Sequence, residues 1–169
     1  MTTASLRDAR PADFPRILAL NEAVVHYLSP LDPARLARLH GMAACHRVVE
    51  LDGDVAGFLL AFREGADYDS PNYRWFAARY RRFLYIDRVV VAAERQGLGL
   101  GRQLYADLFA IARGQSSGWV TCEFDLEPPN EASRRFHAGF GFREVGTQVA
   151  GLAIRKRVSL QALELSSLR

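Results

Sequence analysis

The sequence predicts a single mixed α/β domain of the α+β type, and two segments carry most of that prediction. In Leu84–Arg113, an apolar run rich in β-branched residues (Leu84–Val91) is typical of a buried strand. A glycine-rich turn follows it, and then a helix whose apolar residues recur every three or four positions. In the other segment, His46–Phe62, Asp52-Gly53 is a two-residue hairpin turn that makes the strands His46–Leu51 and Val55–Phe62 antiparallel.

Further strands and helices alternate along the chain. Gly57, inside the second hairpin strand, indicates a bulge or a close approach of another backbone. Asp13 is suited to cap a helix, and Pro15 suits the first turn of that helix. The other predicted elements are a strand Ser5–Arg10, a helix from Asp13 to about Tyr27, a helix Pro33–Gly41, a strand Trp119–Phe124, a helix Glu131–Ala138, a strand beginning over Phe142–Val145 and a last strand Gly151–Leu160.

Composition narrows the class of protein. A chain of 169 residues with 49% hydrophobic and 24% charged residues has the size and balance of one globular domain with a substantial core. Its apolar runs are too short to cross a bilayer, and its first ten residues have no apolar signal core. The expected compartment is therefore the cytoplasm, with no membrane partner.

Charge and metal-binding residue types give little reason to expect other partners. The net charge is +3, and Lys156 is the only lysine. Arg79–Arg82 mixes cations with an aromatic ring, but the small excess of positive charge favours a solvated face or an anion-binding rim over a nucleic-acid site. The four histidines and two cysteines show no metal-ligand spacing, so no metal is expected.

The glycine-rich turn is a candidate phosphate site. Glycines at the start of a helix let backbone N–H groups and the positive end of the helix dipole converge on an anion. A P-loop would need a lysine that is absent here, and a dinucleotide fingerprint would need glycines where Arg102 and Leu104 stand. The pattern that fits is Gln96-x-x-Gly99-x-Gly101.

A second segment, Pro129–Phe142, identifies the type of site. Together with the Gln96–Gly101 pattern it resembles the GNAT superfamily of acetyl-CoA-dependent N-acetyltransferases. The family pattern has an asparagine, a small residue three positions on, an apolar residue six on, usually a tyrosine seven on, and Gly-Phe at eleven and twelve. The matching residues are Asn130, Ser133, Phe136, Gly141 and Phe142, while His137 stands at the tyrosine position. The close resemblance covers Leu84–Gly146.

The resemblance implies a mostly antiparallel central sheet of six to seven strands, splayed to form an acetyl-CoA cleft and flanked by about four helices. It also implies that the glycine turn binds the pyrophosphate of acetyl-CoA and that main-chain groups of the preceding strand bind its pantetheine arm. The implied cofactor-binding residues are Val89, Val90, Val91, Gln96, Gly97, Leu98, Gly99, Leu100, Gly101, Arg102, Asn130 and Ser133.

Acetyl transfer to an amine needs groups that move protons. His137 occupies the position from which relatives protonate the departing thiolate, and this role would require a raised pKa or a pH-sensitive rate; the alternative is that His137 only packs at the end of its helix. Asp87 and Glu123, carboxylates within apolar strands, are candidate bases. For Asp87, a salt bridge with an arginine such as Arg88 is an equal alternative.

The amine acceptor is predicted only as a class. The stretch Arg63–Arg82 lacks periodicity and is expected to be a loop that mixes acidic with aromatic residues. Of these, Tyr68, Tyr73 and Trp75 suit an ammonium group over a ring face. The alternative is that Trp75 only fills an edge of the core. A small-molecule amine, an amino acid or a peptide N-terminus would fit. A non-catalytic acyl-CoA sensor is the rival function, and a homodimer is left open.

Overall fold

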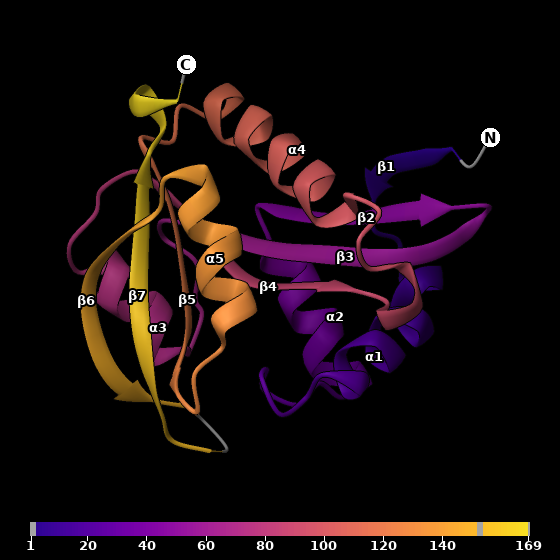
Figure 1. Ribbon diagram of the computed structural model, residues 1–169, viewed down its shortest axis with the longest axis horizontal. Helices are drawn as coiled ribbons and strands as arrows, with labels where there is room; N and C mark the ends of the chain where they lie inside the picture. The colour runs from indigo at the N-terminus through magenta and orange to yellow at the C-terminus, as the bar shows by residue number, and fades with distance from the viewer. Residues whose placement is uncertain (1–2, 152–153, 169) are drawn as a thin grey trace. The chain divides into compact units, whose positions relative to one another are not determined.

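A computed structural model describes residues 3–151 and 154–168 of the chain (Figure 1). Seven strands form one sheet in the order β1-β2-β3-β4-β5-β7-β6. The pairings β1–β2, β2–β3, β5–β7 and β6–β7 are antiparallel, and β4–β5 is parallel. The predicted mixed, mostly antiparallel sheet is confirmed, and the described residues form five α-helices where about four were expected.

The chain divides into two compact units. Unit 1 comprises Met1–Phe62 and Ile86–Ile111, and unit 2 comprises Arg63–Tyr85 and Ala112–Arg169. That the whole chain acts as one domain stays a prediction.

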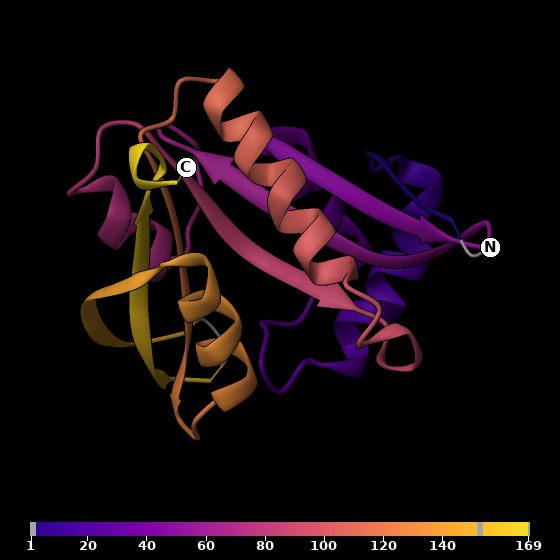
Figure 2. The same cartoon turned by 45° about the horizontal axis from the view of Figure 1, so that its top comes forward.

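Unit 1 places helices on both faces of a β-meander. Its strands are β1 (Ala4–Asp8), β2 (Cys45–Leu51), β3 (Asp54–Arg63) and the later part of β4 (Phe83–Val91); the last residue of β3 belongs to unit 2. Its helices are the 3-10 helix η1 (Pro11–Asp13), α1 (Phe14–Ala23), α2 (Pro33–Met42), the 3-10 helix η2 (Ala93–Arg95) and most of α4 (Leu100–Gly114). Figures 1 and 2 show α1 and α2 on one face of the strands and α4 on the other. Alternation along β2 agrees with this: Val48 packs with Ile17 and Leu36, while Arg47 pairs with Asp107 of α4 at 2.7 Å.

The predicted hairpin is confirmed, and Gly57 combines both features expected of it. Val49 of β2 pairs with Gly57 and Glu50 pairs with Val55, so the extra residue of a bulge, Ala56, lies in β3 next to Gly57. A Cβ added at Gly57 would also lie 2.6 Å from the carbonyl oxygen of Val90. Only glycine permits that approach of two backbones.

The first helix is shorter than predicted. It ends at Ala23, and residues 24–27 form turns where the helix was expected to continue to Tyr27. Two β-branched residues in succession, Val24 and Val25, weaken the helix at this point. Asp13 precedes α1 without capping it, because its carboxylate instead accepts hydrogen bonds from Arg7 and from the N–H of Arg10.

Unit 2 contains the other half of the strands. Its elements are α3 (Pro71–Ala77), the first three residues of β4, β5 (Trp119–Glu127), α5 (Glu131–Phe140), β6 (Arg143–Ala150), β7 (Lys156–Glu164) and η3 (Leu165–Ser167). Figure 1 shows α3 and α5 on opposite sides of β5, β7 and β6. The ladder of β4 with β5 consists of three residue pairs, from Phe83↔Trp119 to Tyr85↔Thr121. The splayed cleft stays a prediction.

Two predictions in this unit were wrong in extent. The stretch Arg63–Arg82 is not all loop, because α3 forms within it, capped by the Ser70 hydroxyl and with Pro71 in its first turn. The last strand runs from Lys156 to Glu164 and not from Gly151 to Leu160; Leu152, which contributed to that prediction, lies outside the described residues. Of the described helices, none is long and apolar enough to cross a membrane.

Candidate active site

The glycine turn of unit 1 has the backbone geometry that its sequence predicted. After η2, Gly97 and Gly99 adopt positive φ angles of 79° and 78°, which residues with a Cβ rarely adopt. The chain then enters α4, where the N–H of Gln103 makes a helical bond to the carbonyl of Gly99 at 3.1 Å. The backbone N–H groups of the first turn of α4 come before this first helical hydrogen bond, as they do at the start of any helix. Residues 96–99 are exposed, so solvent and ligands can reach the turn from which α4 begins.

Successive side chains at the end of β4 point to opposite faces of the strand. Val90 is buried in the core cluster formed with α1 and α2, while Val89 and Val91 are half-buried on the alternate face. The predicted contribution of this segment is through main-chain groups. Its side chains serve packing, as expected from their alternation.

Asp87 lies in a buried salt bridge. Its Oδ2 accepts a hydrogen bond from Nε of Arg88 at 2.7 Å, and the Asp87 and Arg88 side chains are only 6% and 2% exposed. Arg88 also donates to Oδ1 of Asn21 at 2.9 Å and to both the carbonyl and the hydroxyl of Ser29. Of the two alternatives for Asp87, this geometry favours the salt bridge, because the carboxylate neutralises a buried cation that anchors the end of α1.

In unit 2, the first turn of α5 orients His137. The side-chain oxygen of Asn130 caps the helix by accepting a hydrogen bond from the Ser133 N–H at 3.2 Å. The carbonyl oxygen of Ser133 lies 2.7 Å from Nδ1 of His137, and its hydroxyl oxygen lies 3.2 Å from the same atom. Because a carbonyl can only accept, Nδ1 of His137 carries the hydrogen in this contact, and in the neutral ring Nε2 then has the lone pair.

The surroundings of His137 lower its pKa. The side chain is buried, stacked on Phe124 and edge-on to Phe136 and Phe142. Burial lowers the pKa of His137 below its ordinary value, and the hydrogen bond to Ser133 opposes this in part. The pKa of His137 is thus shifted downward, whereas the sequence led us to expect a raised pKa if His137 acts as a general acid.

Glu123 is held by a tyrosine that the sequence did not single out. The phenol oxygen of Tyr85 lies 2.9 Å from Oε1 and 2.8 Å from Oε2 of Glu123. Two residues further along β5, Asp125 pairs with Lys156 at 2.9 Å. Glu123 is half-buried, so it remains accessible from one side.

The three aromatic residues predicted to contact the acceptor take part in packing. Tyr68 and Tyr73 are buried against each other, and the Tyr73 hydroxyl donates to the carbonyl of Arg63 at 2.6 Å. Trp75 lies so close to Gly146 that an added Cβ there would be 2.6 Å from the indole ring. The guanidinium of Arg79 stacks over Trp75, 3.8 Å from the ring centroid. The chain therefore supplies its own cation to this ring.

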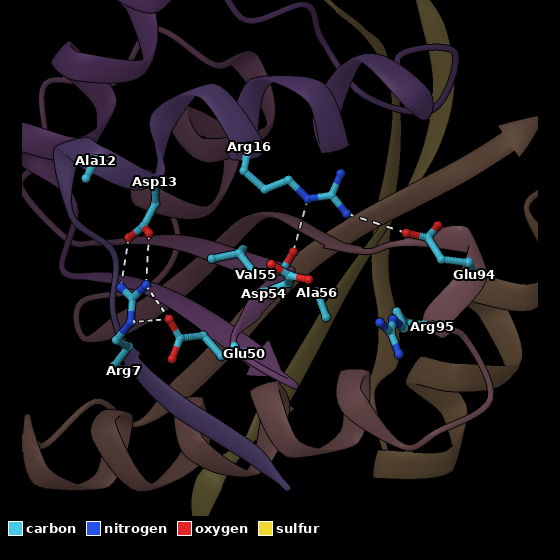
Figure 3. Close-up of a pocket in the computed structure, with 11 residues that line it drawn as sticks. Arg7, Ala12, Asp13, Arg16, Glu50, Asp54, Val55, Ala56, Glu94 and Arg95 are labelled. Carbon is cyan, nitrogen blue, oxygen red and sulfur yellow. Dashed lines mark hydrogen bonds and ion pairs between the residues drawn. The ribbon is translucent and has the colours of Figure 1, made fainter. Parts of the chain in front are cut away.

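A charged cavity of about 430 Å³ lies elsewhere in unit 1, beside β1, α1 and η2. Figure 3 shows Arg7 turned toward Asp13 and Glu50, with which it pairs at 2.8 and 2.6 Å, and Arg16 turned toward Glu94. The opposite charges that line the cavity thus largely pair with one another. In the described residues, none of the predicted site residues lines it.

Arg88 was named from the sequence only as an alternative partner for Asp87, and Tyr85 was not singled out. Both lie within the apolar run of β4, where a polar side chain needs a partner. That signal was noted for Asp87 and could have been extended to its neighbours. Within residues 3–151 and 154–168, no group of three His, Cys, Asp or Glu side chains is placed to hold a metal ion; the expected absence of a metal stays a prediction.

Fold and glycine turn together define a class: mixed α/β proteins in which a strand, a glycine-rich turn and a helix form a site for an anionic cofactor. Comparison with known families makes the class specific. Residues 5–142 match the model of the Acetyltransferase (GNAT) family. The match covers most of the chain, and the chain therefore belongs to this family.

Individual relatives agree with this membership. A phosphinothricin N-acetyltransferase of Streptomyces coelicolor is 44% identical over 59 residues, which are 35% of this chain and 33% of that protein. The match thus spans about a third of that relative's length. The structure of yncA, a putative acetyltransferase from Salmonella typhimurium with its cofactor acetyl-CoA, superposes with a TM-score of 0.74 at 23% identity over 96% of this chain and 94% of that one. Ard1 from Thermoplasma volcanium gives a TM-score of 0.79 at 16% identity over 95% and 97% of the two chains.

Proposed function

We propose that this protein transfers an acetyl group from acetyl-CoA to a primary amine by direct attack while both substrates are bound. The observation that carries the proposal is the turn before α4, in a chain of the GNAT family. Two glycines with φ near +80° open a fifteen-residue helix whose first N–H groups follow an exposed turn. Such a turn suits a pyrophosphate, which acetyl-CoA carries.

We propose cofactor contacts for each unit by itself. In unit 1, Gln96–Arg102 supply backbone donors, and Arg102 a guanidinium, for the pyrophosphate, and the main chain of Val89–Val91 supplies hydrogen bonds for the pantetheine arm. In unit 2, Asn130 and Ser133 belong to the proposed cofactor set. Their observed hydrogen bonds already cap α5 and orient His137. A contact with the cofactor would therefore be a second role for each.

In the proposed reaction the acceptor ammonium first loses a proton to a carboxylate. The nitrogen lone pair then attacks the thioester carbon, a C–N bond forms and the nitrogen releases its second proton to solvent. The C–S bond breaks, and CoA leaves as a thiolate that takes up a proton. Glu123 is the better candidate for the carboxylate. It is half-buried and bound to a neutral phenol, whereas Asp87 neutralises the buried Arg88.

We keep His137 as the proposed proton donor to the thiolate, with a defined consequence. Because burial lowers its pKa, only a small fraction of His137 is protonated at neutral pH. With Nδ1–H bonded to Ser133, the proton to be transferred would be carried on Nε2. A rate that depends on this proton must rise as the pH falls below about 6.5.

The acceptor is proposed as a class: a small-molecule amine, an amino acid or a peptide N-terminus. The accessible carboxylate of Glu123 supports a cationic acceptor. Recognition over the ring of Trp75 would require Arg79 to move, since its guanidinium lies on that ring. Tyr68 and Tyr73 are buried, and the Tyr73 hydroxyl already donates to the carbonyl of Arg63.

A second function, acyl-CoA binding without transfer, is favoured by one observation. His137, at the position where relatives usually have tyrosine, is neutral and enclosed by three phenylalanine rings. A domain that had lost its general acid could retain the cofactor site and act as a sensor.

The test is acetyl transfer to a panel of amines, followed by CoA thiol release and by mass spectrometry of the products. A mass increase on an amine together with stoichiometric thiol release supports the transferase. Binding of acetyl-CoA with no product across small amines, amino acids and peptides would instead support the sensor. Cell fractionation and solution mass measurement test the predicted cytoplasmic location and the homodimer that the sequence left open.

A further inference from the structure

We propose that Tyr85 is a positioning residue: its phenol holds the Glu123 carboxylate in one direction and in its ionised form, ready for the acceptor's ammonium. The inference rests on the proposed function, in which Glu123 receives the amine proton. The Tyr85 oxygen lies within 2.9 Å of both carboxylate oxygens. Because the carboxylate only accepts, the phenol donates its single hydrogen to this group.

The sheet explains why these two residues meet. Tyr85 is the register partner of Thr121 in the parallel ladder of β4 and β5, so the two side chains stand on the same face. Glu123 follows two residues later and returns to that face, about 6.6 Å further along the strand. A tyrosine side chain is long enough to span this offset. The contact is thus set by strand register and does not depend on a loop.

The ring of Tyr85 is fixed by its packing. The residue is fully buried, and its ring lies 5.7 Å from that of Tyr73 and 5.8 Å from that of Phe76. Glu123 has three rotatable side-chain bonds and partial exposure. The rigid group therefore directs the flexible one, and the carboxylate takes its orientation from the phenol.

Several polar side chains around Tyr85 and Glu123 have partners of their own. On the same face of β5, the negative charge of Asp125 is compensated by Lys156. The Tyr73 hydroxyl is bound to a main-chain carbonyl, and Tyr80 packs on Trp119. Cys122, next in sequence, has its pKa raised by burial and by the Glu123 charge, so it stays a neutral thiol. A donated hydrogen bond from Tyr85 stabilises the ionised form of the carboxylate.

The experiment compares Tyr85→Phe with Tyr80→Phe. Both changes remove one phenol hydroxyl from the aromatic group around Phe76, but only Tyr85 donates to Glu123. We expect Tyr85→Phe to move the acid limb of the kcat/KM profile to higher pH by about one unit, the shift for loss of one hydrogen bond to a carboxylate. The limb of Tyr80→Phe should match that of the unchanged protein. A ¹³C NMR titration of the Glu123 carboxyl reads the same shift without turnover.

The outcomes separate this inference from the proposed function. If Glu123→Gln abolishes transfer but Tyr85→Phe leaves both the acid limb and the NMR titration unchanged, the positioning role is wrong while the transferase stands. If Glu123→Gln retains full activity and an unchanged profile, Glu123 is not the base and the inference falls with that assignment. If no amine is acetylated, the proposed transferase activity is wrong. In that case the NMR titration still tests the effect of the Tyr85 phenol on the Glu123 carboxylate, and an unshifted titration in Tyr85→Phe would overturn it.

Discussion

At the scale of single residues, His46 shows how burial turns a common side chain into a pH-dependent one. Its Nδ1 lies 2.7 Å from Nδ1 of His40, and its Nε2 is buried with no hydrogen-bond partner among the described atoms. Burial, then the nearby charges of His40 and Arg88, lower the pKa of His46 to about 4, although Asp13 acts in the opposite direction. Protonation would place a second N–H where no acceptor waits.

This arrangement predicts a loss of stability in mild acid. Because the folded pKa is depressed from about 6.5, the unfolded chain binds more protons between the two values, and the free energy of unfolding falls as the pH drops from about 6.5 to about 4. We expect this group to account for about 3 kcal/mol over that interval. Urea unfolding at pH 7 and pH 5 measures the slope.

Two variants isolate the contribution of His46. His46→Leu removes the titrating group and should flatten the slope, even if it lowers stability at pH 7. His26→Gln is the control, since His26 is exposed and should leave the slope unchanged. Equal slopes in all three proteins would contradict the assignment to His46.

His137 allows a second prediction at this scale. If it protonates the thiolate, kcat rises as the pH falls below about 6.5, because its pKa is lowered and more of the ring becomes protonated there. His137→Tyr replaces it with an acid whose ordinary pKa is about 10, so kcat should lose this dependence. Steady-state rates from pH 5 to pH 9 at saturating substrates decide the matter. A kcat profile identical in both proteins would assign His137 to packing alone.

At the scale of elements, the sequence predicted the core of most strands and helices but not their ends. Local signals suffice for Leu84–Val91 and for the hairpin at Asp52-Gly53. The end of α1 had a local signal in Val24-Val25. The structure adds Arg88, which binds Asn21 within the helix and Ser29 beyond it, a contact between residues far apart in sequence. The start of α3 had a local signal, Ser70-Pro71, within a stretch interpreted as loop.

The cap of α5 gives a prediction that separates structure from cofactor binding. Asn130→Ala removes the acceptor of the Ser133 N–H and should lower the free energy of unfolding by about 1 kcal/mol. Asn130→Asp keeps a side-chain oxygen for the cap and should retain stability. Thermal or urea unfolding measures the first effect, and KM for acetyl-CoA the second. A raised KM in Asn130→Asp with unchanged stability would indicate a direct role toward the cofactor.

At the scale of the whole molecule, the sequence motifs predicted the backbone of the glycine turn better than the surroundings of the proposed proton carriers. A glycine turn is a local device, so Gly97 and Gly99 could be predicted together with their backbone role. The partner of Glu123 is set by strand register, which no local pattern states. Arg88, the partner of Asp87, is its neighbour in sequence and was one of the two alternatives considered for it. The lowered pKa of His137 likewise arises from rings brought together by the fold.

Acetyl-CoA binding provides the last prediction, because a ligand that binds only the folded chain stabilises it. At one hundred times its dissociation constant, acetyl-CoA should add about 2.7 kcal/mol to the free energy of unfolding and raise Tm by several degrees. Hydrogen exchange should slow in residues 89–102 of unit 1 and in the first turn of α5 in unit 2. The control is Gly41→Ala, at a position in α2 where an added Cβ meets no atom within 4 Å, and it should retain the full shift. Gly99→Ala should lose it, because φ at this position is +78° and alanine would distort the turn that presents the backbone donors. An equal Tm shift in Gly99→Ala would place the pyrophosphate elsewhere.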